Sequence, residues 1–353
     1  MKLKVWLAIV AICLAGFVQA GSVGATSYFY RDINPQGAST TGTYQCIAIN
    51  DAKQIVGCIF SVPQAFLWTS NKGYTLLKPL GSNTGCLAAA INKQGQIVGS
   101  SVNANGYWHA CLWNDPAQPP IELVSADDPT HSGASGINDA GLIVGYYGDP
   151  AHKHAYKWTA PMQGTDLGTL GGSTSTATGV NNAGQIVGEA ADVQGITRAC
   201  IWNSGSQSPQ SLGLTALLSS AYCINNQGNV VGYYSPSGIG DDDQAFYWDQ
   251  HSIIDITPEL YYNFAPGISD ANQVVGWQAQ QGFTDPTIIF WNPAKGKQDL
   301  NKMIVNLPKG VTIQFLDAIS PKKGYLAGTD SRWHVCLLTP LAAPSANSLL
   351  LLE

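Results

Sequence analysis

Charged residues are scarce in this sequence, and the basic ones form no large cluster. Asp, Glu, Lys and Arg make up 11% of the 353 residues, and the formal net charge is −6. No sizeable Lys/Arg cluster occurs after the N-terminus, whereas binding to nucleic acid requires several cations that neutralise phosphates. The composition therefore predicts that nucleic acid is not a partner.

Local catalytic motifs are missing as well. The sequence contains no G-x-S-x-G elbow, no H-E-x-x-H, no C-x-x-C pair and no phosphate-binding loop. We therefore predict no catalytic residues and no organic cofactor, and favour a protein that is not an enzyme. A site assembled from distant segments leaves no local motif, so an enzyme stays open as the alternative.

Long apolar runs are absent except at the N-terminus. Lys2 and Lys4 precede an apolar run from 5 to 17, and residues 18–20 read Val-Gln-Ala. This pattern predicts a cleaved signal peptide over 1–20 and a short linker over 21–27. The run is short for a bilayer crossing and no stop-transfer segment follows it. We expect a secreted protein, extracellular or periplasmic, without a transmembrane segment.

Seven of the eight cysteines remain once Cys13 is removed with the signal peptide. Three of them, Cys111, Cys200 and Cys336, occupy a position where other copies have Phe or Tyr, which favours burial as small apolar groups. Cys46 and Cys58 lie symmetrically about a predicted hairpin turn and are expected to face each other across two strands. A disulfide between them is one interpretation, and two buried thiols are the other.

A unit of roughly 44 residues repeats seven times. The first strand of each copy ends in three residues: Ala, Gly or Cys, then Ile or Val, then Asn or Ser. The central apolar residue of the three lies at 49, 91, 137, 180, 224, 268 and 319. An Asn-x-x-Gly turn and a second strand ending in Ile-Val-Gly follow, and a third strand then ends in Trp in six copies. The turn is typical of a tight hairpin with a residue at positive φ, here Lys53 in the first copy and Asn272 in the sixth.

Four short antiparallel strands at this period are typical of a β-propeller blade. The last copy lacks a clear fourth strand, and an unassigned strand at 28–33 precedes the first copy. We therefore predict an all-β fold: a seven-bladed β-propeller over 28–340, with four-stranded antiparallel blades and a ring closed by the N-terminal strand. A C-terminal tail at 341–353 follows, and a monomer is expected.

The segments 166–173 and 179–188 resemble the HAF repeat of bacterial extracellular proteins, which is named after the His-Ala-Phe that opens its third strand. The resemblance covers residues 28 to about 339. Other residues replace the Phe in five copies and the His in four. The resemblance implies an extracellular or cell-envelope location and transfers no activity or catalytic residue.

The turns divide the ring into two rims. The Asn-x-x-Gly turns occupy one, called here the constant rim, and the more variable loops occupy the other, called here the variable rim. The variable rim is expected to carry aromatic candidates for binding a sugar or a peptide: Tyr146, Tyr147, Tyr233, Tyr234 and Trp277. The alternative is that these aromatics only pack the ends of strands.

A polar residue opens each third strand: Gln64, His109, His154, Arg198, Gln244, Thr287 and His334. Of these we select His109 and His154 as ligand-binding candidates, although sevenfold recurrence favours ties between strands. The six tryptophans of the third strands are expected in the core for the same reason. Asp241 and Asp243 are the candidates for a Ca²⁺ site, with a solvated loop as the alternative.

The sequence thus predicts an exported binding or adhesion module that recognises a glycan or a cell-surface protein on its variable rim. The alternative is an exported propeller enzyme, a glycan hydrolase or lyase, that uses the acidic residues at 241–243 with His109 or His154. A second alternative is a structural component of the cell envelope.

Overall fold

The computed structural model describes residues 27–34, 44–59, 62–81, 85–123, 131–149, 151–160, 163–238, 242–257, 262–279 and 286–341. The predicted signal peptide, nearly all of the linker, Asp241 and the tail from 342 lie outside these residues. In the described part of the chain, no helix is both long enough and apolar enough to cross a membrane.

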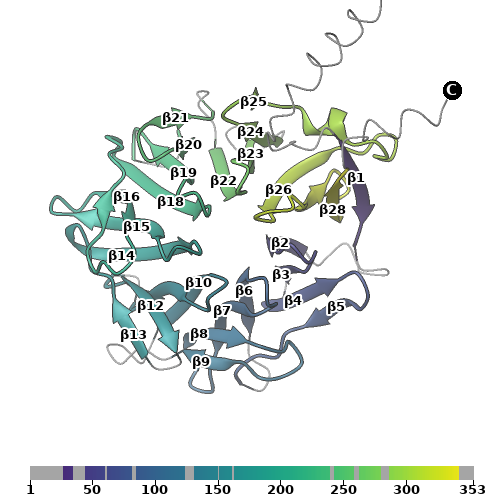
Figure 1. Ribbon diagram of the computed structural model, residues 1–353. Coiled ribbons are helices and arrows are strands. Elements are labelled where there is room, and N and C mark those ends of the chain that lie inside the picture. The colour runs from purple at the N-terminus through teal and green to yellow at the C-terminus, as the bar shows by residue number, and fades with distance from the viewer. Residues whose placement is uncertain are drawn as a thin grey trace, which may run out of the picture.

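The described strands form seven four-stranded antiparallel sheets around a central axis, which confirms the predicted seven-bladed β-propeller (Figure 1). Blade 1 consists of β2 (Tyr44–Ile49), β3 (Ile55–Ile59), β4 (Gln64–Thr69) and β5 (Gly73–Leu76). Blade 2 consists of β6 (Cys86–Ile91), β7 (Ile97–Val102), β8 (Trp108–Trp113) and β9 (Ile121–Leu123). Blade 3 consists of β10 (Ser132–Ile137), β11 (Ile143–Tyr147), β12 (His154–Ala160) and β13 (Gln163–Asp166).

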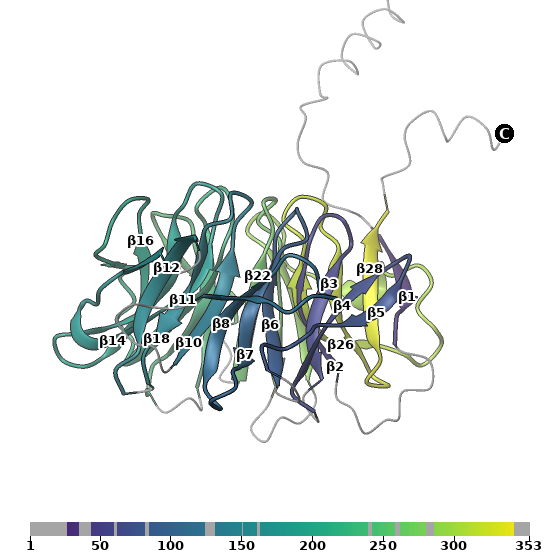
Figure 2. The ribbon, with the colours of Figure 1, turned by 90° about the horizontal axis from the view of Figure 1, so that it is seen from below.

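The remaining blades follow in chain order. Blade 4 consists of β14 (Gly171–Val180), β15 (Ile186–Asp192), β16 (Thr197–Trp202) and β17 (Gln210–Ser211). Blade 5 consists of β18 (Leu218–Ile224), β19 (Val230–Ser235), β20 (Gln244–Trp248) and β21 (Ile253–Asp255). Blade 6 consists of β22 (Tyr262–Ile268), β23 (Val274–Ala279), β24 (Thr287–Asn292) and β25 (Gly296–Lys297). Figure 2 shows the ring from the side, with the strands running between the two rims.

Blade 7 is built from both ends of the chain. It contains β26 (Ile313–Ile319), β27 (Leu326–Asp330) and β28 (Val335–Pro340), and its outer strand is β1 (Tyr28–Asp32). β1 pairs with β28 in antiparallel register. The side chain of Asn306, just after the 3₁₀ helix η1 (Leu300–Met303), exchanges two hydrogen bonds of 2.7 and 2.9 Å with the backbone of Tyr30. The predicted closure by the N-terminal strand is confirmed.

The apolar core lies between neighbouring blades. One cluster, for example, joins Leu67 and Leu77 of blade 1 to Ile97 and Trp113 of blade 2. Three of the repeated tryptophans, Trp113, Trp158 and Trp202, are among the largest fully buried side chains. Burial on both faces of each blade explains why the strands are almost continuously apolar, and it places these tryptophans in the scaffold.

The Asn-x-x-Gly turns have the predicted geometry. In the second copy the Gly95 N–H donates to the Asn92 carbonyl, and Gly95 has a φ of 83°. Lys53 and Asn272, which replace this glycine in two copies, have φ values of 59° and 57°. The turn thus holds a residue in the left-handed region whether or not it is glycine.

Each innermost strand also carries a β-bulge that the sequence analysis did not predict. In β2 the register shifts between Cys46 and Ala48, which leaves Ile47 unpaired, and the other innermost strands shift at the equivalent place. The bulge brings the backbone close to the Ile-Val-Gly glycine of the next strand. A Cβ at Gly57 would collide with the Gln45 carbonyl oxygen, so this repeat position requires glycine.

The same bulge corrects the expectation about Cys46 and Cys58. Because of the shifted register, Cys46 pairs with Gly57 and Cys58 pairs with Gln45. The Cys46 side chain packs in the cluster shared with blade 7, whereas the Cys58 thiol donates to the Ala88 carbonyl of blade 2. The expectation that the two cysteines face each other is wrong, and both are free buried thiols.

Candidate functional site

The bulges place one residue from each innermost strand at the central axis. These residues line a hollow of about 370 Å³ together with the turns that follow them. In blade order they are Ile47, Ala89, Ser135, Thr178, Tyr222, Pro266 and Asp317. The repeat is otherwise regular, yet this position holds seven different residue types. Such variation at one position of a constrained repeat is the signal that sequence reasoning could have used to find the hollow.

The hollow opens at the constant rim, because its lining continues into the Asn-x-x-Gly turns. Two hydrogen-bonded girdles hold this mouth. In the first, the Asn side-chain amide of one blade donates to the backbone carbonyl of the equivalent residue in the next, as from Asn138 to Asn181 at 3.0 Å. In the second, a backbone N–H donates to the side chain that follows that Asn, as from Asp139 to Asn182 at 2.9 Å. These hydrogen bonds join neighbouring blades around the mouth.

The lining of the hollow carries more negative than positive charge. Its ionisable residues include four aspartates, Asp51, Asp139, Asp270 and Asp317, and two lysines, Lys93 and Lys322. Lys93 lies 3.6 Å from the carboxylate of Asp139 at the mouth. The Asp51 carboxylate accepts the backbone N–H groups of Lys322 and Lys323. These contacts hold the charged side chains at the mouth in place. Asp317, in contrast, lies on the wall of the hollow.

Asp317 is the bulged residue of β26 and is only 7% exposed. Burial raises the pKa of its carboxyl to about 7, against a smaller lowering by a hydrogen bond with Gln45. Its second oxygen, Oδ2, is buried and has no hydrogen-bond partner among the described residues. An unpartnered carboxyl oxygen in a cavity wall is costly, because the group has lost water without gaining a donor.

The predicted aromatics of the variable rim divide into three groups. Tyr147 and Tyr234 each have their hydroxyl bonded within the blade: Tyr147 to Asp166 at 3.0 Å, and Tyr234 to Gln244 at 2.6 Å and Asp255 at 2.8 Å. Tyr146 stands apart, with the Lys153 ammonium 4.4 Å from the centre of its ring. Tyr233 and Trp277 belong to a larger aromatic group.

This larger group is a row of six aromatic side chains, here called the aromatic row, that crosses blades 5, 6 and 7. Its members in order are Tyr233, Tyr222, Phe264, Trp277, Phe315 and Trp333, with neighbouring ring centres 4.7 to 5.7 Å apart. Tyr222 and Phe264 also line the hollow. The row therefore connects the wall of the hollow to the turn between β27 and β28 on the variable rim.

Trp333 ends the row and is 63% exposed. Its backbone has a φ of 63°, in the left-handed region that a bulky residue rarely adopts, and its N–H donates to the Asp330 carbonyl. The sequence analysis missed Tyr222, Phe264, Phe315 and Trp333. They come from three repeat positions, with Phe264 and Phe315 at the same one, and the packing of the blades brings them together.

The two selected histidines tie the third strand of a blade to its fourth. The Nδ1 atom of His109 lies 2.7 Å from the Glu122 carboxylate, and that of His154 lies 2.9 Å from the Asp166 carboxylate. They lie in blades 2 and 3, whereas the acidic loop at 242–243 lies in blade 5. Ligand binding by these histidines stays a prediction, and their observed contacts are within their own blades.

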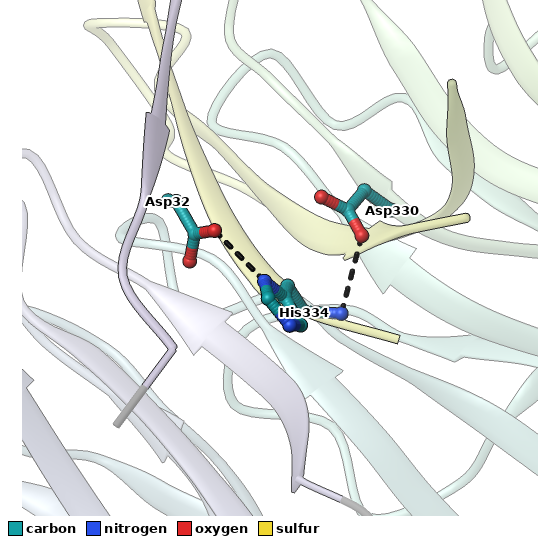
Figure 3. Close-up of side chains that lie close together, drawn as sticks. All are labelled: Asp32, Asp330 and His334. Atoms are coloured by element: carbon teal, nitrogen blue, oxygen red, sulfur yellow. Dashed lines mark hydrogen bonds and ion pairs between the residues drawn. The ribbon is translucent and has the colours of Figure 1, made fainter. Parts of the chain in front are cut away.

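In blade 7 the equivalent histidine joins a cluster of ionisable groups, drawn in Figure 3. His334 pairs with Asp32 of β1 at 2.8 Å, and Asp330 lies close by. Among the described residues, this is the one trio whose ligand atoms lie close enough to hold a metal ion. However, the Arg332 guanidinium already donates to both carboxylates and to the Tyr30 hydroxyl. The cluster is therefore an ionic clasp that joins β1 to blade 7.

The predicted Ca²⁺ ligands lie partly outside the described residues, because Asp241 is not among them. The carboxylate of the intervening Asp242 accepts hydrogen bonds from the hydroxyls of Ser235 and Ser237, at 2.5 and 2.8 Å, and from the Ser237 N–H. The backbone carbonyl of Asp243 accepts from Asn263. Calcium binding by Asp241 and Asp243 stays a prediction.

No family model matches this chain, and no curated protein matches its sequence. Solved propellers resemble its fold at low identity. TolB from Acinetobacter baumannii matches with a TM-score of 0.47 at 11% identity, over 84% of this chain and 63% of TolB, so the chain spans less than two thirds of that protein. A catalytically inactive virginiamycin B lyase from Staphylococcus aureus, with quinupristin, matches with a TM-score of 0.49 at 9% identity, over 89% of this chain and 100% of the lyase. The Aleuria aurantia lectin in complex with Fucα1-6GlcNAc matches with a TM-score of 0.41 at 14% identity, over 76% of this chain and 96% of the lectin. All three TM-scores lie below 0.5, and the β-propeller fold of this chain is established by its own seven sheets.

Proposed function

We propose that this chain is an exported, non-enzymatic binding propeller of the HAF-repeat type, and that it recognises a glycan through the aromatic row. The observation that carries the proposal is Trp333, a large aromatic side chain that is 63% exposed on a backbone with positive φ. Neither feature improves packing. Both are understandable if the ring stacks against the apolar face of a sugar.

The surroundings of the row supply hydrogen-bond acceptors. Burial raises the pKa of Tyr222 and Tyr233, and the negative charges of Glu189 and Asp243 raise both pKa values further. Two carboxylates therefore lie near the inner end of the row. Flat aromatic faces beside carboxylate acceptors match a ligand that has apolar faces and hydroxyl edges, as sugars do.

Export is proposed from the N-terminal pattern at 1–20 and from the resemblance to HAF repeats. A protein ligand is the alternative occupant of the row, because exposed aromatics also anchor protein interfaces. An exported glycan hydrolase or lyase, and a structural envelope role, are less favoured. His109 and His154 are engaged inside blades 2 and 3, away from the acidic loop of blade 5.

The test is a glycan array with the mature chain, followed by titration of the best ligand with two variants. Trp333→Ala removes the exposed end of the row, and we expect affinity to fall at least about tenfold. Tyr107→Ala is the matched control, because Tyr107 is 41% exposed in the equivalent turn of blade 2 and lies outside the row. Equal affinity of both variants and the parent chain would show that the row is not the binding surface. If no glycan on the array binds and affinity capture recovers a protein, the ligand is a protein and not a glycan.

A further inference from the structure

The hollow at the constant rim contains an acceptor that nothing in the described part of the protein satisfies. The Oδ2 atom of Asp317 is buried in the wall and has no donor among the described residues. The asparagine amides and the three aspartates at the mouth, in contrast, already bond to neighbouring blades. Gln45 bonds to the Asp317 carboxyl, but Oδ2 has no donor among the described residues, and a buried oxygen in that position in a cavity wall indicates that its donor comes from outside.

The charges of the lining decide what kind of donor fits. Four aspartates face two lysines in the hollow, and Lys93 is already paired with Asp139. An anion would meet a net negative field, whereas a cation is attracted to it. A divalent metal ion is a poorer fit, because no trio of metal ligands that includes Asp317 occurs among the described residues.

The aromatic rings in the wall and the volume of the hollow favour an organic cation. Tyr222 and Phe264 line the hollow, with their rings edge to face at 4.7 Å between centres. Aromatic rings attract ammonium and guanidinium groups and also cover an alkyl stem. A volume of about 370 Å³ is at the lower end of the range that small-molecule sites occupy.

We propose that the central hollow is a second binding site that takes a ligand with a primary ammonium or guanidinium group, and that shares Tyr222 and Phe264 with the inner part of the aromatic row. The cationic head donates to Oδ2 of Asp317, and the stem packs beside Tyr222 and Phe264. The site lies at the opposite rim from Trp333, so it neither depends on the proposed function nor restates it.

Binding is coupled to the protonation of Asp317. The groups that face this carboxyl are Gln45 and Cys46 on β2 and Cys336 on β28. Burial raises the pKa of both thiols well above their usual value, so they stay neutral. The charged groups at the mouth are the three aspartates and two lysines named above. A cation favours the ionised form of Asp317, so affinity should rise as the pH increases through the folded pKa of about 7.

The experiment is calorimetric titration of the mature protein with n-butylammonium, n-butylguanidinium and the uncharged n-butanol. We expect the two cations to bind at least about tenfold more tightly than the alcohol at pH 8, and to bind progressively more weakly toward pH 5. Near pH 7, titrations in buffers of different ionisation enthalpy should show proton release upon binding. These measurements need no variant, so they stand even if a substitution unfolds the ring. Binding of butanol as tight as that of the cations, or an affinity independent of pH, would overturn the proposal.

Three variants locate the site. Asp317→Asn keeps the shape and removes the ionisable acceptor, and should lower the affinity for both cations at least about tenfold. Asp115→Asn removes one negative charge from an exposed loop of blade 2 and should leave the affinity for both cations unchanged. Trp333→Ala should lower glycan affinity at least about tenfold and leave cation affinity unchanged. Unchanged cation affinity in Asp317→Asn would refute the site, whatever the glycan result. The preferred cation then identifies the source: a small amine resembles butylammonium, and an arginine side chain of a peptide resembles butylguanidinium.

Discussion

The side-chain amide of Asn50 donates to the backbone carbonyl of Asn92, 2.9 Å away, and so joins blade 1 to blade 2. The same bond recurs from Asn92, Asn138, Asn181 and Asn225 to the next blade. In each case the Asn side-chain oxygen also accepts N–H groups within its own turn. One repeated residue therefore shapes the hairpin and binds the blades into a ring.

The first prediction separates these two roles at Asn138. Asn138→Ala removes two bonds within the turn and one to blade 4, and should lower the free energy of unfolding by roughly 3 kcal/mol, at about 1 kcal/mol per bond. Asn138→Ser should lose less, because Ser269 and Ser320 hold the equivalent turns of blades 6 and 7 through their hydroxyls. Urea denaturation measures both variants. Equal losses would mean that the serine does not replace the turn bonds.

The second prediction concerns ring closure by β1. A chain that begins at Asn34 lacks β1 and leaves the edge of β28 unpaired. Buried Asp330 also loses the Tyr30 hydroxyl from its clasp. We expect a lower melting temperature and self-association through the open edge, because an unpaired strand is a template for pairing. Light scattering after size-exclusion chromatography checks this, with a chain that begins at Gly21 as the control. A truncated chain that stays monomeric and equally stable would contradict the role of β1.

The third prediction is the pH dependence that Asp317 imposes on stability. Its pKa in the folded state is about 7, whereas an aspartate in water has an ordinary pKa of 3.8, so the folded state binds the proton more tightly. The stabilisation is complete below pH 3.8 and is lost as the pH rises through about 7. At 1.36 kcal/mol per pKa unit the loss is roughly 4 kcal/mol. Asp317→Asn should therefore exceed the parent chain in stability most clearly above pH 7. The same advantage at pH 4 and pH 8 would show that Asp317 does not titrate in this window.

The fourth prediction concerns the cysteines. The seven cysteines of the described residues are free, and burial raises the pKa of Cys58 to about 11. The folded protein should therefore react slowly with a thiol reagent that requires the thiolate. In denaturant without reductant we expect seven reactive thiols, and eight if the segment with Cys13 is retained. Two fewer would indicate a disulfide and contradict the free Cys46 and Cys58.

The sequence alone determined the architecture, because the strands and turns of a propeller blade produce local patterns that repeat along the chain. The spacing of the Ile-Asn and Ile-Val-Gly strands determined seven blades, and the unassigned strand at 28–33 determined how the ring closes. The turn chemistry also placed Lys53 and Asn272 at positive φ correctly. Each of these features depends on a strand or turn and its immediate neighbours, so a repeat reveals it.

The tertiary structure decided what depends on register and on contacts between blades. The bulge before Ala48 separated Cys46 from Cys58, because a shift of one residue changes every pairing beyond it. The six members of the aromatic row come from four repeat positions in three blades, so no single repeat position reveals it. Asp317 is one acidic residue in the sequence, and only the closed ring buries it in a cavity wall, where its Oδ2 atom has no donor among the described residues.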